Sequence, residues 1–311
     1  MKYFLLTMIL FTTAAIADTL LVPSEYAGIH SAISAAQDGD TVLVAPGDYC
    51  GGFSFQGKNI VLRSSAGAGE TFIHSPFSDY HCVMFMGGED STAVLEGFSI
   101  TNTGFDGSSS KGQDPVKYGG GLYITDSSPT IRNNIITNCV VTGTGGGVYS
   151  KNSSFQMTNC VISSNDAWES GGGLSIGGSA AGNPPRIIGC TVTANDAQYG
   201  GGFYLRGDTV MVINNTISGN YGRGIRVSGC HAFISGNMIS GNQGGVLINS
   251  GSTYLIGNMI VENTAGLGGG IYETSSDVIH LENNTIALNT ASGYGGVFGG
   301  GIITTNDTLY L

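Results

Sequence analysis

The sequence predicts an all-β fold, a single-stranded right-handed parallel β-helix (solenoid) with a short N-terminal capping helix. Clusters of glycine recur every 21 to 31 residues, short alternating apolar strands follow them, and asparagines recur near an isoleucine or valine. The 52 glycines among 311 residues are clustered, whereas collagen would place one at every third position. Such a period indicates an array in which no single repeat buries its apolar face alone.

Residues 1–17 have the features of a secretory signal peptide. Lys2 precedes an apolar run, and the small-residue ending Ala15-Ile16-Ala17 predicts cleavage before Asp18. No later segment reaches the roughly 20 apolar residues of a membrane span. We therefore expect a secreted protein, extracellular or at the cell surface, with no membrane span.

Residues 18–94 are expected to form the cap helix and the first, irregular coils. Ser24 is the predicted helix N-cap, and Gly39 marks the predicted stop. A helix there would cover the unpaired strand edges of the first coil, which would otherwise invite aggregation. The predicted apolar face of this helix comprises Tyr26, Ile29, Ile33 and Ala36.

Residues 95–311 are expected to form regular rungs, each rung being one turn of the solenoid. The residue after each glycine cluster is apolar and the next is mostly able to face water, which is strand alternation. Without helix-length segments between them, these strands are expected to stack in parallel at about 4.8 Å. Each rung has an apolar marker followed two or three places later by Asn; the markers are Ile100, Ile136, Ile162, Val192, Ile217, Ile239, Ile260 and Ile286.

A column of asparagines two places before these markers is predicted to stack inside the coil. A buried amide has two donors and two acceptor lone pairs, which identical amides above and below can satisfy. The predicted ladder comprises Asn134, Asn215, Asn237, Asn258 and Asn284, with Cys160 and Cys190 in the same column. The final stretch GGGIITTNDTLYL stops inside a rung, so we expect either that the chain continues or that another domain or subunit covers this edge.

The six cysteines match no zinc or disulfide-rich spacing, and we expect most of them to be small buried residues. A disulfide between Cys160 and Cys190, one rung apart, is the alternative for that pair. The net charge of −11 and the thin spread of basic residues exclude nucleic acid as a partner. A long acidic polysaccharide would also be repelled unless a cation or a local arginine patch compensated.

Two loops, SNDAWESGGG and ANDAQYGGG, carry the first candidate site. Asp166 and Asp196 occupy equivalent places one rung apart, at a predicted separation of about 5 Å, close to that of a retaining glycosidase pair. Trp168 and Tyr199 offer an aromatic platform for a sugar ring. Glu169 adds a third acid, and with the two aspartates it is a candidate ligand for calcium. Ordinary Asn-Asp turn chemistry is the alternative.

The second candidate site is basic and aromatic. Arg226 lies within two rungs of Arg206, Arg223 and His231, and it is a candidate catalytic base for a lyase. The alternative is a solvated strand face. An outward column offers rings for glycan stacking, or for shielding the sheet; it comprises Tyr123, Tyr149, Tyr204 and Tyr272.

The chain resembles bacterial secreted right-handed parallel β-helix repeat proteins of the pectin-lyase-like superfamily. The resemblance rests on the segment 26–49, on GKNIVL at 57–62, on LEGFSITN at 95–102 and on the repeated GGG and N-x-I units. That superfamily holds carbohydrate enzymes beside surface proteins without catalysis. The NTD, double-aspartate, GHG and RIK motifs of polygalacturonases are missing, as are the WIDH-like and RxPxxR-like motifs of pectate lyases.

The rung pattern also resembles chlamydial-type polymorphic surface proteins, which favours display over chemistry. The first functional hypothesis is therefore an exported surface protein that presents an elongated face for adhesion or for binding a cell-surface glycan or other polysaccharide. The alternative is a carbohydrate-active enzyme, either a polysaccharide lyase or a glycoside hydrolase.

Overall fold

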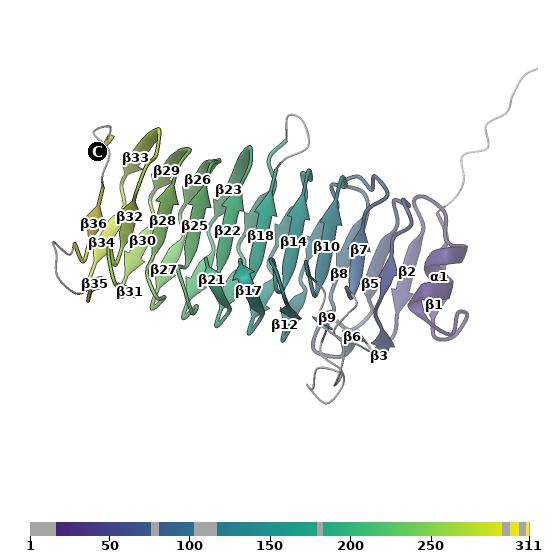
Figure 1. Ribbon diagram of the computed structural model, residues 1–311. Coiled ribbons are helices and arrows are strands. Elements are labelled where there is room, and N and C mark those ends of the chain that lie inside the picture. The colour runs from purple at the N-terminus through teal and green to yellow at the C-terminus, as the bar shows by residue number, and fades with distance from the viewer. Residues whose placement is uncertain are drawn as a thin grey trace, which may run out of the picture.

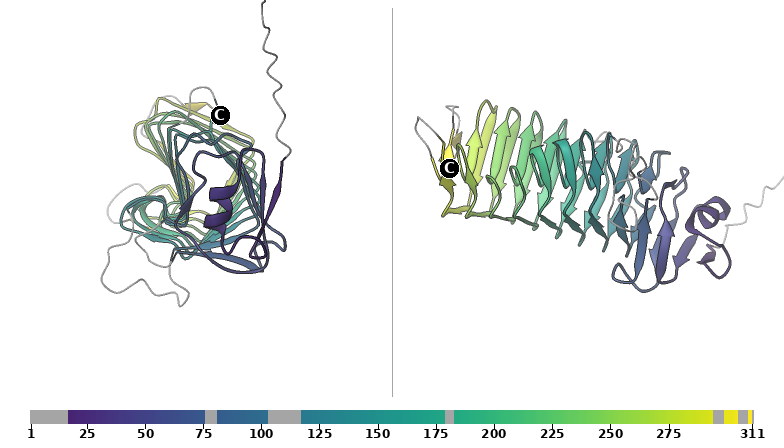
Figure 2. Two further views of the ribbon diagram at one scale, coloured as in Figure 1. Left: turned by 90° about the vertical axis from the view of Figure 1, so that its right-hand side faces the viewer. Right: turned by 60° about the horizontal axis from the view of Figure 1, so that its bottom comes forward.

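The computed structural model describes residues 17–75, 81–102, 117–178, 183–293, 299–304 and 309–310. These residues form a right-handed parallel β-solenoid of about 10 turns, in which the described part of the chain has a single short helix (Figure 1). Viewed along the axis, the turns lie over one another around a common core (Figure 2). The predicted fold class is confirmed. Residues 1–16, which include most of the predicted signal peptide, lie outside the described residues.

Three long parallel sheets run the length of the solenoid, and most rungs contribute one strand to each of them. Sheet A comprises β1 (Thr19–Val22), β2 (Thr41–Val44), β5 (Val61–Ser64), β8 (Val94–Glu96), β11 (Thr130–Arg132), β15 (Gln156–Thr158), β19 (Arg186–Ile188), β23 (Thr209–Ile213), β26 (His231–Ser235), β29 (Ser252–Ile256), β33 (Val278–Glu282) and β37 (Leu309–Tyr310). Sheet B comprises β3 (Gly47–Cys50), β6 (Thr71–His74), β9 (Ser99–Thr101), β12 (Ile135–Thr137), β16 (Val161–Ser163), β20 (Thr191–Thr193), β24 (Thr216–Ser218), β27 (Met238–Ser240), β30 (Met259–Val261) and β34 (Thr285–Ala287).

Sheet C follows the glycine clusters, and two short sheets lie between sheets B and C along the chain. Sheet C comprises β4 (Phe53–Ser54), β7 (Val83–Phe85), β10 (Leu122–Thr125), β14 (Val148–Lys151), β18 (Leu174–Gly177), β22 (Phe203–Arg206), β25 (Ile225–Ser228), β28 (Val246–Asn249), β32 (Ile271–Glu273) and β36 (Ile302–Ile303). Sheet D comprises β13 (Val140–Val141), β17 (Asp166–Ser170) and β21 (Asp196–Tyr199), and sheet E comprises β31 (Thr264–Ala265) and β35 (Thr290–Ala291).

The isoleucine and valine markers lie above one another in sheet B, as predicted. Ile136 pairs with Ile100 on one side and with Ile162 on the other, and the same register continues through every later marker to Ile286. All of them except the partly buried Ile286 are buried. Neighbouring rungs therefore share one continuous apolar core, which a single rung could not form.

The predicted asparagine ladder is present. Asn215 donates from Nδ2 to Oδ1 of Asn237 at 3.0 Å, and Asn237 donates to Asn258 in the same way at 3.0 Å. Asn258 continues to Asn284 at 2.9 Å. In the Cys160 and Cys190 rungs a buried thiol replaces the amide, and the backbone N–H of Cys190 donates to Oδ1 of Asn215 at 2.8 Å. Asn134 stands at the start of the column and accepts from the backbone N–H of Phe98.

A second ladder runs parallel to the first at the next corner of the coil. In the sequence these asparagines are visible only as spacing markers, not as a ladder. Each one donates from Nδ2 to Oδ1 of the next at 2.8 to 3.0 Å. The members are Asn165, Asn195, Asn220, Asn242, Asn263 and Asn289.

The helix α1 (Ile29–Ala35) lies across the N-terminal end of the solenoid (Figure 2) and buries Ile29, Ala32 and Ile33 against the core. The prediction that Ser24 caps this helix is wrong, because the N-cap is Gly28. The backbone N–H groups of residues 25 and 26 both donate to Leu21 O, so the chain first turns back on β1 and becomes helical only afterwards.

All six cysteines are free, and all but the exposed Cys50 are buried, so the expectation of small buried residues is confirmed. Cys160 and Cys190 form no disulfide; the backbone N–H of Cys160 donates to Sγ of Cys190 at 3.4 Å. No helix in the described ranges is long and apolar enough to cross a membrane.

Candidate functional site

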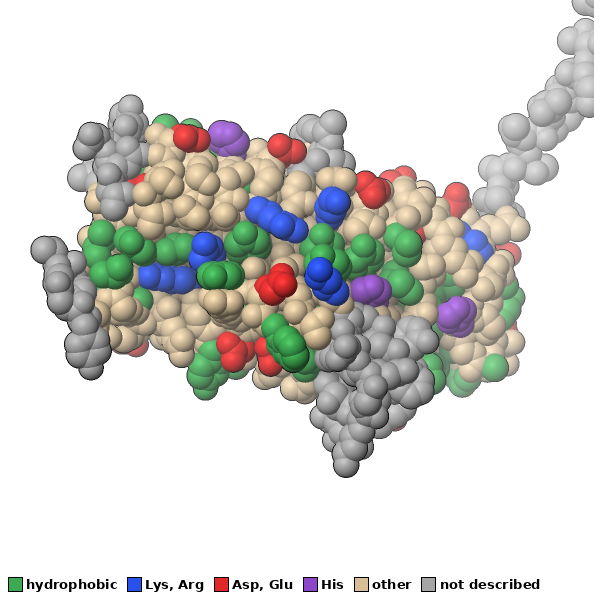
Figure 3. All heavy atoms as spheres, in the orientation of Figure 1, with side chains coloured by type: hydrophobic (Ala, Val, Ile, Leu, Met, Phe, Trp, Pro, Cys, Tyr) green, Lys and Arg blue, Asp and Glu red, His purple; other side chains and the backbone are tan. Residues whose placement is uncertain are grey.

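The outward side of sheet C carries the predicted tyrosine column. Tyr123 pairs in register with Tyr149, which is followed by Ser175, Tyr204 and Arg226 on successive strands. Because the strands are parallel and in register, these side chains project to the same side at about 4.8 Å per rung. Figure 3 shows the result as a band of hydrophobic and basic side chains along the strands of this sheet. We call this outward surface the sheet C face.

Aromatic rings stack at the N-terminal part of the sheet C face. The ring of His81 lies on Tyr123 with centroids 4.5 Å apart, and Tyr123 stacks on Tyr149 at 5.6 Å. Tyr118 packs against Tyr149 from the side at 4.9 Å. Tyr149 is therefore only 5% exposed, whereas Tyr123 and Tyr204 remain partly exposed. The structure brings Tyr123 and Tyr149 together and leaves Tyr204 apart, beyond Ser175.

A hollow of about 440 Å³ opens on this face where one strand has small side chains. On β18, Gly177 pairs with Lys151 on one side and with Arg206 on the other. With no side chain at Gly177, the side chain of Arg206 lies over this position, and its Nε is 2.9 Å from the place of a Cβ atom there. The hollow is lined by Tyr118, Tyr149, Lys151, Asn152, Gly177, Gly178, Arg206 and Gly207.

The sheet C face concentrates positive charge in a chain whose net charge is −11. Three of the chain's 11 basic residues, Lys151, Arg206 and Arg226, stand on strands of this sheet. Two more lie beside it, Lys117 over the ring of Tyr118 and Arg223 over the ring of Tyr272. The guanidinium of Arg226 lies 4.6 Å from the ring centre of Tyr199. Burial lowers the pKa of Arg223 to about 10, so this group is still charged at neutral pH. The local basic patch that an acidic polysaccharide would require is therefore present.

Sheet D brings the predicted aspartate pair together. Asp166 on β17 pairs in register with Asp196 on β21, and Ala167 and Ala197 beside them form a small separate core with Val141. Burial, and then the charge of Asp196, raise the pKa of Asp166. The two carboxylates thus interact, as their places in the repeat predict.

Three exposed aromatic side chains accompany this pair. Trp168 is 65% exposed, Tyr199 is 42% exposed and Tyr221 is 57% exposed. Tyr221 stands on the next rung, and its backbone forms a parallel β-bridge with Asp196. Tyr221 was not among the predicted site residues, although it follows Asn220 just as Asp166 follows Asn165. Because Arg226 lies over Tyr199, this aromatic edge joins the sheet C face.

The calcium hypothesis gains no support from the arrangement of the acids. Among the residues that the structure describes, no three His, Cys, Asp or Glu side chains gather as metal ligands. Glu169 is exposed on β17, and it forms no such group with Asp166 and Asp196. His231 begins β26 of sheet A, so it does not share the sheet C face with Arg226.

The raised pKa of Asp166 has a consequence for stability. We expect Asp166→Asn to raise the melting temperature at pH 7 by on the order of 1 °C, because the charged carboxylate is disfavoured in the folded state. The folded protein holds this proton more tightly than the unfolded chain, so the gain should vanish below about pH 4, where both states are protonated.

Calorimetry at pH 7 and pH 3.5 measures this difference. Asp277→Asn, which removes the same charge at an exposed position, is the matched control. A lower melting temperature of Asp166→Asn at pH 7 would contradict the interpretation of the pair.

The fold defines a class, that of proteins with a right-handed parallel β-helix. The family model described as "Right handed beta helix region" matches residues 172–310. A second model, "Protein of unknown function (DUF1565)", matches residues 64–200. No curated protein matches the sequence significantly.

Solved structures similar to the chain include two proteins that are named for their action on polysaccharides. The pectate lyase Pel9A matches with a TM-score of 0.51 at 15% identity, covering 91% of this chain and 82% of its own. The A-module of the mannuronan C-5 epimerase AlgE6 from Azotobacter vinelandii matches with a TM-score of 0.41 at 14% identity, covering 89% of this chain and 94% of its own. At such identities the likeness shows the fold alone. The chain thus has a right-handed parallel β-helix fold, as the pectate lyase Pel9A does.

Proposed function

We propose that the protein is an exported β-helix surface protein that binds a glycan along the sheet C face without cleaving it. The observation that carries the proposal is the hollow between Lys151 and Arg206, with Tyr149 and Tyr118 in its wall. Aromatic rings stack on the apolar faces of sugars, and cationic side chains bind carboxylate or sulfate groups. Export and display at the cell surface rest on the predicted signal peptide and remain part of the proposal.

The charge distribution favours an acidic glycan over a neutral one. Basic residues gather on one face of an otherwise acidic chain, so an anionic polymer meets a local attraction there. At physiological salt, charges farther away than about 8 Å are largely screened, and the near patch therefore outweighs the net charge. The parallel, in-register strands hold these groups on a rigid surface, which limits the entropy lost on binding.

Glycoside hydrolysis at the Asp166 and Asp196 pair is the second candidate. The observation in its favour is the interaction of two adjacent carboxylates, one with a raised pKa, beside exposed aromatic rings. A retaining glycosidase uses such a pair. The motifs of pectate lyases are missing from the sequence, so a lyase has no comparable support.

Calorimetric titration with a panel of acidic and neutral oligosaccharides tests the proposal. We expect an acidic glycan to bind, with affinity that falls as salt rises, and Arg206→Ala or Lys151→Ala to weaken binding about tenfold or more. Arg186→Ala removes the same charge from an exposed position on sheet A and should change nothing.

Product analysis in the same samples separates the two candidates. New reducing ends that disappear in Asp166→Ala or Asp196→Ala would establish the hydrolase instead. Equal loss of binding in Arg186→Ala would show that the sheet C face is not the binding surface.

A further inference from the structure

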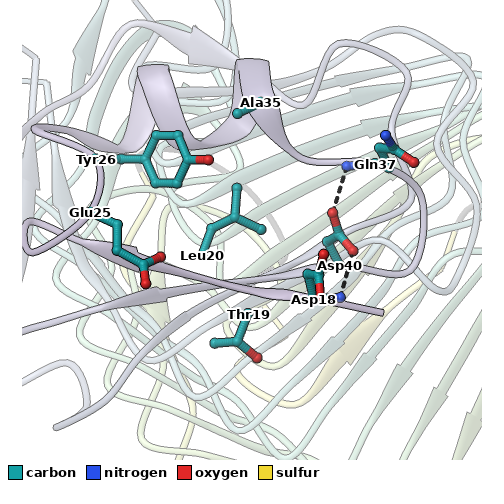
Figure 4. Close-up of a pocket in the computed structure, with 8 residues that line it drawn as sticks. All are labelled: Asp18, Thr19, Leu20, Glu25, Tyr26, Ala35, Gln37 and Asp40. Atoms are coloured by element: carbon teal, nitrogen blue, oxygen red, sulfur yellow. Dashed lines mark hydrogen bonds between the residues drawn. The ribbon is translucent and has the colours of Figure 1, made fainter. Parts of the chain in front are cut away.

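A buried carboxylate lies at the N-terminal end of the solenoid, beneath the capping helix. Asp40 is only 7% exposed and follows α1 in the turn that leads into β2. Its Oδ1 accepts a hydrogen bond from the backbone nitrogen of Asp18 at 2.8 Å, and its Oδ2 accepts one from the backbone nitrogen of Gln37 at 2.8 Å (Figure 4).

The partner of Asp40 is the residue at which the sequence predicts signal-peptide cleavage. Hydrolysis of the Ala17–Asp18 bond consumes one water, leaves a carboxylate on Ala17 and leaves an amino group on Asp18. The nitrogen that now donates one hydrogen to Asp40 as a neutral amide is the atom that would become the α-ammonium group. Cleavage would thus place a full positive charge 2.8 Å from a buried carboxylate oxygen.

The hollow beside this nitrogen has no cationic side chain among the described residues that line it. A hollow of about 300 Å³ beside it is lined by Asp18, Thr19, Leu20, Glu25, Tyr26, Ala35, Gln37 and Asp40. The titratable side chains in this lining are three carboxylic acids and one tyrosine, with no Lys, Arg or His among them. A buried carboxylate favours a paired cation, and an α-ammonium group would supply it.

The backbone already holds Asp18 in the required place. Thr41 donates from its backbone nitrogen to Asp18 O at 2.8 Å, and β1 pairs with β2 in register from Thr19 onward. Leu20 and Val22 on β1 are buried in the core. The contact with Asp40 therefore needs no rearrangement after cleavage.

We propose that Asp40 is the binding site for the α-amino group that a secretory-pathway peptidase creates by cleaving between Ala17 and Asp18. Processing then converts a neutral hydrogen bond into an ion pair that fastens β1 to the end of the solenoid. The inference rests on the predicted signal peptide and is independent of glycan binding.

The full chain, expressed with its own leader in a secreting host, provides the test. Mass spectrometry of the secreted protein should find Asp18 as the first residue. The α-amino group, titrated by NMR, should have a pKa near 9 or above, against about 7.7–8.0 for a free one, because Asp40 stabilises the charged form. A first residue other than Asp18, or an ordinary pKa, would overturn the proposal.

A variant that retains Ala17 as its first residue is the matched control, because its Asp18 nitrogen is an amide and its Asp40 is intact. Because the pKa of the α-amino group is raised in the folded state, the ion pair stabilises the protein fully below about pH 7.5. This stabilisation is lost as the pH rises through the pKa that the α-amino group has in the folded protein. The melting temperature of the processed protein should therefore fall between about pH 8 and pH 10, whereas that of the variant retaining Ala17 should stay level.

Asp40→Asn should remove the pH-dependent fall, and Asp38→Asn, whose carboxylate bonds only the backbone of Asn59 in the described structure, should keep it. If Asp40→Asn does not fold, the ion pair is tested by comparing how the melting temperature depends on pH in the processed protein and in the variant that retains Ala17. Equal pH profiles for the processed protein and the Ala17 variant would contradict the ion pair.

Discussion

Asn237→Ala is expected to lower the free energy of unfolding by about 3–5 kcal/mol. Asn237 accepts from both the backbone nitrogen and Nδ2 of Asn215, at 2.8 and 3.0 Å, and donates to Val212 O at 2.8 Å. Alanine removes these partners at a buried position. Each buried polar group left without a partner costs about 1–3 kcal/mol.

Two further variants make this prediction specific. Asn237→Cys should cost less than Asn237→Ala, because Cys160 and Cys190 already occupy the same column in earlier rungs. Asn183→Ala, at an exposed position, should change stability by less than about 0.5 kcal/mol. Urea denaturation followed by circular dichroism measures all three, and equal costs for Asn237→Ala and Asn183→Ala would show that the ladder contributes little.

Gly173→Ala is expected to cost about 3 kcal/mol, because a side chain there meets the next rung. A Cβ atom at Gly173 would lie 2.7 Å from Gly202 O and 3.1 Å from Cγ1 of Val192. The carbonyl belongs to the backbone of the adjacent rung, so relief of the contact would require two rungs to move apart. The third glycine of this cluster is therefore needed for close approach of the backbones.

Gly69→Ala is the control for this prediction. Nothing lies within 4 Å of a Cβ atom at Gly69, so alanine should be neutral or slightly stabilising there. The same denaturation measurement compares the two variants. A cost for Gly173→Ala no larger than that for Gly69→Ala would mean that the rungs separate without difficulty.

The sequence was sufficient to predict those parts of the fold that depend on repetition. Ile136 and Ile162 stack because each occupies the same place in its rung, and a repeat makes such places visible in one sequence. The second ladder was missed because the asparagine stands two places after the apolar marker in the first rungs and three places after it in the later ones. In the rung of Ile136, Asn138 stands two places after the marker and Cys139 stands three places after it. Cys139, not Asn138, takes the inward position that Asn165 takes in the next rung.

The start of the helix could not be read from helical propensity, since it depends on a contact with β1. Ser24 is a suitable cap in isolation, but hydrogen bonds from residues 25 and 26 to Leu21 keep this segment in a turn. The hollow on the sheet C face was hidden for another reason. It lies beside Gly177, which stands between Lys151 and Arg206 on successive strands, and this placement is visible only once the strands are aligned.

For the candidate site, the sequence correctly predicted which side chains lie next to one another, but not how far each of them is exposed. Tyr149 belongs to the predicted column, yet Tyr118 and Tyr123 pack around it and leave it largely covered. Tyr118 lies outside the repeat pattern, which is why this covering was not foreseen. Asp166 and Asp196 were predicted as a pair because they hold the same place in two consecutive rungs.

The bonds between side chains in both asparagine ladders point the same way. In each ladder the amide of one rung donates to the oxygen of the next, toward the C-terminal end. The dipoles of these amides therefore add along the axis instead of cancelling. Each amide that joins such a row polarises those already in it, so lengthening the solenoid strengthens the bonds behind the growing end.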